Sequence, residues 1–251
     1  MVSTRRPTVA SRTLAEQLRP VVHAHDAVRE TRYAQFDIER ARARLRSGRA
    51  AFDAATLIAN AGDLSVAFKR TSQAFERTGI ASTPEVAALQ KRAVDPTTVV
   101  LAWANAESTP LDPALRLARS IGAIVGNAIL SRAAADVTMG QALHTWKWPQ
   151  CPCCGASPDL ALSTDARRML VCWRCDTMWR AESRGCLGCG ATGEPNIARV
   201  TSPYLGYELA ICISCGRYLK ERRGALNHEL LVERTLIAGL DEAAQLRGLR
   251  A

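Results

Sequence analysis

The cysteines are the residues in this chain that are most able to do chemistry. All nine lie between Cys151 and Cys215, in a sequence of 251 residues. Eight of them form four Cys-x-x-Cys pairs, which are Cys151/Cys154, Cys172/Cys175, Cys186/Cys189 and Cys212/Cys215. Two residues between cysteines let one tight turn direct both sulfurs at one metal ion, and two such turns complete a tetrahedron. The spacing therefore predicts that these eight cysteines are metal ligands rather than disulfide partners.

The residue that follows each pair supports this prediction. A turn that presents two sulfurs, here called a knuckle, needs a residue that accepts a positive φ angle after its second cysteine. Gly155, Gly190 and Gly216 stand at three of these places, and Asp176, a tolerated but poorer choice, stands at the fourth.

Two metal ions per chain are expected, and the sequence leaves their details open. The simplest arrangement joins the first pair with the second and the third with the fourth, although a cross-braced arrangement satisfies the same counts. All-thiolate sites accept iron or zinc, and spacing does not separate the two metals. Cys153 is left over as a spare thiol beside the first site, or as a thiol for redox chemistry or an incoming cluster. His144 and His228 flank the region and are not expected to be ligands.

Short apolar runs must position the knuckles. Residues 169–171 lead into Cys172 and residues 209–211 lead into Cys212, which is typical of the second strand of a ribbon hairpin. We therefore expect a first module at residues 149–182 and a second module at residues 183–223, each rubredoxin-like or zinc-ribbon-like. Residues 224–251 are expected to form a C-terminal helix, with four apolar residues on one face: Leu230, Ile237, Leu240 and Ala244.

Residues 1–148 are expected to be helical, because Ala, Leu, Arg and Glu dominate them. Helix starts are indicated where a capping side chain precedes a proline, at Thr83-Pro84, Asp95-Pro96 and Asp112-Pro113. Helix ends are indicated by glycines, at Gly48 and Gly79. An apolar stripe on the helix after Pro113 is expected at Leu117, Ile121, Ile124 and Ala128. The predicted fold class is α with a small β part: an N-terminal bundle of five or six helices, two tandem metal modules and a C-terminal helix.

Composition narrows the class of protein. The chain is 47% hydrophobic and 23% charged, which favours a folded protein over a disordered one. The longest weakly polar run, residues 121–130, is about half of what a bilayer span needs, so no membrane span is expected. The first twelve residues, MVSTRRPTVASR, have no apolar stretch behind their arginines, so no secretory signal is expected. We expect a cytoplasmic protein.

Four strings around the cysteines resemble one family, the formate dehydrogenase accessory proteins of bacteria (FdhE-like). They are CPCCGASP at 151–158, CWRCDTMW at 172–179, CLGCG at 186–190 and CISCGRYLK at 212–220, and the resemblance covers about residues 148–248. It implies a helical N-terminal region and two rubredoxin-like sites, with the eight paired cysteines as metal ligands. It also implies a non-enzymatic maturation factor that binds the catalytic subunit of a respiratory formate dehydrogenase in the cytoplasm and helps it become active. Tyr218, Leu219 and Lys220 match the family motif without an assigned chemical role.

Two other function classes compete with this interpretation. A nucleic-acid-binding zinc ribbon would use the net charge of +9 and the arginines at 40, 42, 44, 46 and 49. Those arginines are, however, typical of a solvated helix face, because Asp37 and Glu39 lie beside them. Two divalent metals on eight thiolates would also add −4 and leave a charge of +5, so nucleic acid is an unlikely partner.

A thiol–disulfide oxidoreductase is the second competitor. Its Cys-x-x-Cys pair would lie at a helix N-terminus, whereas the pairs here end short strands and most are followed by glycine. The chain also has no GxGxxG, phosphate-loop, HExxH or nucleophile-elbow motif. No enzymatic activity is therefore expected.

Overall fold

The computed structural model describes residues 9–92, 94–107, 112–164, 167–182, 184–202 and 206–250, with the side chains of residues 9 and 10 excepted. Residues 1–8, which make up most of the segment judged above for a secretory signal, lie outside these ranges. The chain divides into two compact units. The helical unit contains residues 16–141 together with 153–155, and the sheet unit contains residues 1–15, 142–152 and 156–251.

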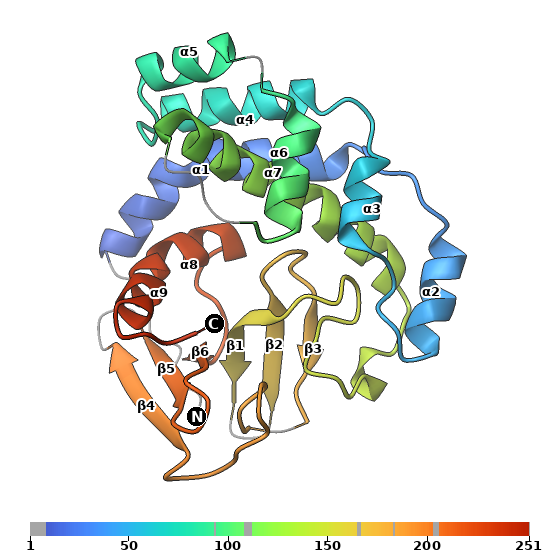
Figure 1. Ribbon diagram of the computed structural model, residues 1–251, viewed down its shortest axis with the longest axis vertical. Coiled ribbons are helices and arrows are strands. Elements are labelled where there is room, and N and C mark those ends of the chain that lie inside the picture. The colour runs from blue at the N-terminus through green and yellow to red at the C-terminus, as the bar shows by residue number, and fades with distance from the viewer. Residues whose placement is uncertain are drawn as a thin grey trace. The chain divides into compact units, whose positions relative to one another are not determined.

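Seven α-helices and one short 3-10 helix (Leu143–Thr145) precede the cysteine region within the described residues, against the five or six helices expected (Figure 1). The α-helices are α1 (Val9–Glu30), α2 (Ile38–Arg46), α3 (Ala54–Ala59), α4 (Ser65–Arg77), α5 (Thr83–Lys91), α6 (Pro96–Ala104) and α7 (Pro113–Thr138). The first seven residues of α1 group with the sheet unit. In the helical unit α7 packs against α2, α3, α4, α5 and α6, so it is the central helix. None of the described helices has the length and apolar composition that a membrane crossing requires.

The expected helix boundaries are largely confirmed. The carboxylate of Asp95 accepts hydrogen bonds from the backbone N–H groups of residues 97 and 98, and Asp112 does the same for residues 114 and 115. At Thr83-Pro84 the N-cap lies one residue earlier than expected. Ser82, and not Thr83, is the N-cap of α5, and its N–H donates to the Glu85 carboxylate over 2.8 Å. Such caps satisfy backbone donors that have no partner within the helix.

Burial along α7 differs in part from the expected stripe. Ile121 and Ala128 are fully buried as expected, whereas Leu117 and Ile124 are only half-buried. The most buried line instead passes through Val125, because α7 is covered on several sides and not on one face.

Two glycines let α6 approach α7 closely. A Cβ atom on Gly126 would lie 2.4 Å from the ring of Trp103, and one on Gly122 would lie 2.7 Å from Val99. Any larger residue at these positions would push the two helices apart, which would open the core around them.

The cysteine region forms one six-stranded sheet with the strand order β3-β2-β1-β6-β5-β4 (Figure 1). The first module supplies β1 (Pro158–Ser163), β2 (Arg168–Cys172) and β3 (Met178–Arg180). The second supplies β4 (Ile197–Ser202), β5 (Tyr207–Cys212) and β6 (Tyr218–Arg223). Each set of three is antiparallel, as expected for ribbons, and β2 and β5 confirm the expected strands. A parallel pairing of β1 with β6, which the sequence did not predict, joins the two modules.

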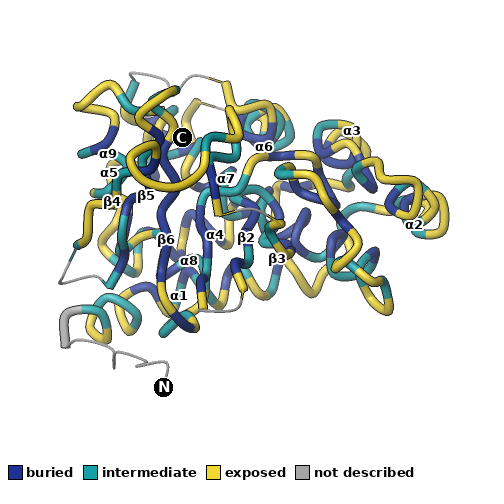
Figure 2. Tube along the Cα trace, turned by 90° about the horizontal axis from the view of Figure 1, so that it is seen from below, coloured by how far each residue is buried: buried dark blue, intermediate teal, exposed yellow. Residues whose placement is uncertain are grey.

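The centre of the sheet is the buried part of this unit. Five of the six residues of β6 are buried, and Figure 2 shows this strand dark along most of its length. The C-terminal segment is helical as expected, but it is divided into α8 (Leu230–Leu236) and α9 (Ala238–Gln245). Ile237, at the break, packs with Leu160, Val171 and Tyr207, so the two helices cover one face of the sheet.

Candidate metal centres

The sulfur atoms of the eight paired cysteines gather into two groups of four. The first group is Cys151, Cys154, Cys172 and Cys175, and the second is Cys186, Cys189, Cys212 and Cys215. Within each group all four sulfurs lie within 4.8 Å of one another. The structure therefore joins neighbouring pairs in tandem and does not have the cross-braced arrangement. All nine cysteines are among the described residues, and none of them forms a disulfide.

These dimensions fit a tetrahedral metal site. A metal about 2.3 Å from each of four sulfurs places the sulfurs about 3.8 Å apart. The Cys151–Cys175, Cys186–Cys215 and Cys189–Cys212 sulfurs are each 3.5 Å apart. Four thiolates are the donor set of structural zinc and of rubredoxin-type iron, so the two tetrads could bind two metal ions.

The two tetrads differ in their access to solvent. All four cysteines of the first tetrad are buried, whereas in the second tetrad Cys189 is exposed and only Cys212 is buried. A metal ion at the second tetrad would therefore be more accessible to solvent than one at the first.

Each knuckle has the backbone that the sequence predicted. Gly155, Gly190 and Gly216 have φ angles of 72°, 77° and 67°, and Asp176 has 58°. The N–H of the first cysteine donates to the carbonyl five residues later in all four knuckles, over 2.8 to 3.0 Å. The repeated bond closes the turn and holds both sulfurs on the same side.

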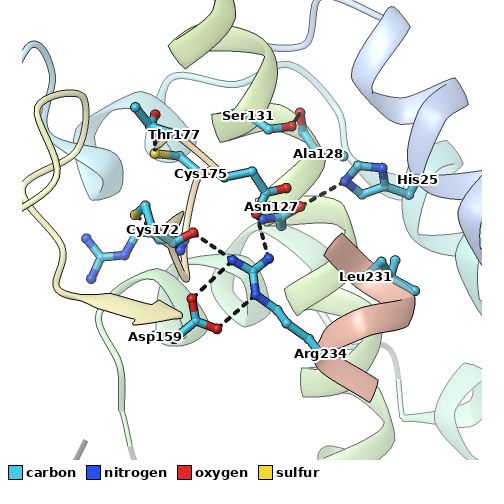
Figure 3. Close-up of polar contacts among 12 residues, drawn as sticks. His25, Asn127, Ala128, Ser131, Asp159, Cys172, Cys175, Thr177, Leu231 and Arg234 are labelled. Carbon is cyan, nitrogen blue, oxygen red and sulfur yellow. Dashed lines mark hydrogen bonds and ion pairs between the residues drawn. The ribbon is translucent and has the colours of Figure 1, made fainter. Parts of the chain in front are cut away.

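Arg234 explains why an aspartate stands at the second knuckle. Its guanidinium donates to the Asp176 carboxylate over 2.5 Å and to the Cys172 carbonyl over 2.7 Å. It also pairs with Asp159 on β1, over 2.9 Å (Figure 3). Burial opposes the charge of Arg234, but the two carboxylates outweigh it and raise the pKa of the guanidinium. Arg234 thus anchors α8 to the second knuckle, a contact that sequence analysis missed because 58 residues separate the partners.

The Tyr-Leu-Lys motif also acquires a role. The Tyr218 hydroxyl donates to Asp241 over 2.8 Å, and the Lys220 ammonium donates to the other oxygen of the same carboxylate over 2.5 Å. Residues 218 and 220 alternate along β6, so they lie on the same face of the sheet. Burial and the Asp241 carboxylate raise the pKa of Tyr218, so the hydroxyl keeps its proton. The motif fixes α9 on the sheet and takes no part in the sulfur groups.

Cysteine ionisation in the second tetrad is uneven. Burial alone would raise the pKa of Cys212, but bonds from the Cys215 N–H and from the neighbouring thiols lower it to about 6. A bond from the Arg217 N–H favours the thiolate of Cys215, yet burial and the three other sulfurs raise its pKa to about 11. One thiolate therefore forms readily, and further thiolates need a cation to compensate them.

Cys153 lies outside both tetrads. It is fully buried, and its carbonyl accepts a hydrogen bond from the Phe52 N–H over 3.0 Å. The flanking histidines are outside the sulfur groups as well. His144 is exposed, and the N–H of His228 donates to Glu233.

The arginines on α2 serve the helical unit. Arg42 donates to the carbonyls of Asp136, Val137 and Met139 at the end of α7. Arg44 donates to the Ala50 carbonyl. A cation at a helix C-terminus compensates carbonyls that have no partner within the helix. These contacts give Arg42 and Arg44 a structural role, which weakens the argument for a nucleic-acid surface on α2.

Comparison with known proteins gives one informative result. No protein-family model matches the chain, and no curated protein matches it either. Among solved structures, the chain is similar to the FdhE protein from Pseudomonas aeruginosa, with a TM-score of 0.66 and 17% sequence identity. The match covers 98% of this chain and 95% of the other. The helices, the sheet and the two sulfur tetrads together therefore belong to a chain with the FdhE fold.

Proposed function

We propose that this protein is a maturation factor that binds the catalytic subunit of a formate dehydrogenase in the cytoplasm and supports its activation. The observation that carries the proposal is the likeness to an FdhE protein over nearly the whole of both chains. At 17% identity this likeness concerns the fold. The four cysteine strings, which resemble the formate dehydrogenase accessory family, connect the fold with the function.

The eight paired cysteines are proposed as the ligands of two metal ions, either iron or zinc. The first ion would be held by Cys151, Cys154, Cys172 and Cys175, and the second by Cys186, Cys189, Cys212 and Cys215. We propose the division that the sequence predicts: a helical domain at residues 1–148, metal modules at residues 149–182 and 183–223, and a C-terminal helical segment at residues 224–251.

No catalytic role is assigned to the chain. Its most reactive side chains are cysteines, and eight of the nine lie in the tetrads. Tyr218 and Lys220 both bond to Asp241, which gives them a structural role. Thiolate sites of this kind are maintained in a reducing compartment, which agrees with the cytoplasm.

Affinity capture tests the proposal. The tagged full chain is expressed in bacteria that produce a formate dehydrogenase, and the captured proteins are identified by mass spectrometry. We expect the catalytic subunit with the wild type, much less of it with Cys154→Ser, and an unchanged amount with Cys153→Ala. Capture that never contains a formate dehydrogenase subunit, although both metals are bound, would refute the proposal.

A further inference from the structure

The second tetrad lies nearer to solvent than the first, and its exposure is concentrated at one knuckle. The cysteines of the first tetrad are at most 7% exposed. In the second tetrad Cys212 is 2% exposed and Cys186 and Cys215 are half-buried, whereas Cys189 is exposed. Cys189 belongs to an exposed stretch, residues 188–190, in the third knuckle. An ion in this tetrad is therefore reached most directly at Cys189.

The third knuckle, residues 186–190, is held mainly by bonds within itself. The N–H groups of Cys186, Gly188 and Gly190 donate to the Ala191 carbonyl or to atoms of Cys186, over 2.8 to 3.3 Å. Among the described residues, no hydrogen bond joins residues 187–190 to another element of the sheet, apart from the contact between the Cys189 sulfur and the fourth knuckle. This loop can therefore move without breaking the bonds of the sheet.

The fourth knuckle, in contrast, is tied to other parts of the sheet unit. The Ile213 N–H donates to the Asn196 carbonyl over 2.9 Å. The Arg250 guanidinium donates to the Cys215 carbonyl over 2.7 Å, and the Arg250 N–H donates to the Gly216 carbonyl over 2.9 Å. The second knuckle is likewise held by α8, as described above. Local opening needs the least free energy where exposed backbone has few such ties, which in these knuckles is the third.

We propose that the second tetrad exchanges its metal ion with thiolate ligands from outside the chain, through departure of Cys189, while the first tetrad retains its ion. In this step the bond between Cys189 and the metal breaks, and its electron pair stays on the sulfur, which then takes a proton from water. An incoming thiolate forms the replacing bond. No electron is transferred, so the step needs no oxidant or reductant.

The inference rests on the proposed binding of metal by the two tetrads, and not on the proposed dehydrogenase partner. Thiolates are soft ligands that suit the same ions as the tetrad itself. Two sources can supply them. One is a small free thiol, and the other is a cysteine pair of a bound protein.

The rate of zinc release from the full chain tests the proposal. The zinc-loaded protein is mixed with excess 4-(2-pyridylazo)resorcinol, which changes its absorbance when it binds zinc. Parallel samples also contain reduced glutathione or the dithiol peptide acetyl-Cys-Gly-Pro-Cys-amide. We expect one ion to leave at least about tenfold faster than the other, because an exposed loop opens more easily than a buried one. The faster phase should accelerate with the concentration of thiol. Acceleration by glutathione assigns the exchange to small thiols, and acceleration by the peptide alone assigns it to a protein's cysteine pair.

Cysteine labelling shows which sulfur leaves, and it needs no variant. The zinc-loaded chain is treated briefly with iodoacetamide, and the modified cysteines are located by mass spectrometry of its peptides. We expect Cys189 to be modified first among the eight paired cysteines, in step with the loss of one zinc ion per chain. The cysteines of the first tetrad should react only after that ion has been lost.

Two glycines of the second tetrad offer a matched pair of variants. Gly190 and Gly216 have φ angles of 77° and 67°, and a Cβ atom on either would meet nothing within 4 Å. Gly190→Ala strains the third knuckle, and departure of Cys189 relieves that strain, so the faster release should accelerate at least about fivefold. Gly216→Ala places the same strain in the fourth knuckle, which stays closed, and should change the rate much less.

Several results would overturn the proposal. They are release of both ions at one rate, a faster phase that neither thiol accelerates, first labelling at a cysteine other than Cys189, and equal acceleration by the two glycine variants. A purified chain that binds fewer than two ions would overturn it together with the proposed metal sites. A chain that binds two ions but releases them at one rate would refute the exchange alone.

Discussion

Asp176 shows how a single residue can combine backbone strain with a useful contact. A residue other than glycine in the left-handed region costs about 1–2 kcal/mol, and aspartate tolerates this region better than most residues. The φ angle of 58° is retained because the carboxylate bonds to Arg234, which also holds Asp159 and the Cys172 carbonyl. A position that seemed a poor choice in the sequence therefore connects the second knuckle to α8.

Substitution of Asp176 should separate these two effects. Asp176→Ala loses the ion pair and keeps the strain, so we expect a free energy of unfolding lower by roughly 1–3 kcal/mol. Asp176→Gly loses the same pair but relieves the strain, so it should lie about 1 kcal/mol closer to the wild type. Urea unfolding of the metal-loaded variants measures both values. Equal stability of the two variants would show that the backbone there is not strained.

The cysteines give a second prediction at this scale. Cys189→Ser should reduce the bound metal from two ions to about one per chain, because a tetrad that loses a thiolate binds far more weakly. Cys153→Ala should keep both ions, since this sulfur lies outside both groups. Elemental analysis of the purified chains gives the stoichiometry. Loss of an ion in Cys153→Ala would make Cys153 a ligand.

Among the elements, the attachment of α9 to β6 is the contact most open to measurement. The Lys220 side chain is 6% exposed, and that of its partner Asp241 is 31% exposed. Removing one member of such a pair leaves a buried charge uncompensated, whereas removing both does not.

A double-mutant cycle should reveal this coupling. We expect Asp241→Ala to lower the free energy of unfolding by about 2–4 kcal/mol. Adding Lys220→Met should restore part of that loss, because methionine fills a similar volume without a charge. Denaturant titration of the wild type, the two single variants and the double variant gives the coupling energy. A double variant less stable than Asp241→Ala would mean that Lys220 stabilises the sheet independently of Asp241.

The second module should bind metal with a characteristic pH dependence. Binding displaces protons from thiols, so the apparent affinity rises with pH. Cys212, with a pKa of about 6, is a thiolate above that pH and a thiol below it. One more proton is therefore released on binding below pH 6 than above it. When the logarithm of the apparent association constant for the metal is plotted against pH, the slope should fall by about one as the pH rises through 6. Chelator competition on a Cys151→Ser/Cys154→Ser chain isolates this site, and a constant slope would contradict the lowered pKa.

Local signals explain why some elements could be predicted and others could not. The knuckles, the strands β2 and β5, and the caps at Asp95 and Asp112 depend on residues a few positions apart, so their spacing identifies them. The break at Ile237 depends on the sheet face beneath it. The Arg234 contacts and the role of Lys220 require partners 21 to 75 residues away. No periodicity contains that information.

At the scale of the whole molecule, the parallel β1–β6 pairing makes one sheet of two modules. Two separate ribbons, as the sequence suggested, would lose or keep their structure independently. In one sheet, β6 belongs to the second module and also supports the first.

Hydrogen exchange can test this dependence. In Cys186→Ser/Cys189→Ser the second metal is lost, and structural zinc contributes about 10–16 kcal/mol to the folding of small zinc peptides. We expect the amides of β1 to exchange at least about tenfold faster, together with those of β5 and β6, because β1 loses its neighbour. Unchanged protection of β1 and β2 would show that the first module folds without the second. Cys153→Ala serves as the control.

The order in which the strands emerge from the ribosome gives the same pairing another consequence. Leu160 lies beside Lys220, so β1 is translated long before the strand that covers its open edge. A nascent chain with only the first module complete exposes a row of unpaired backbone groups in an aggregation-prone form. Early filling of the first tetrad would rigidify that half-finished sheet until β6 arrives. If the tetrads bind metal as proposed, the yield of native protein should depend on the supply of metal during translation and not only afterwards.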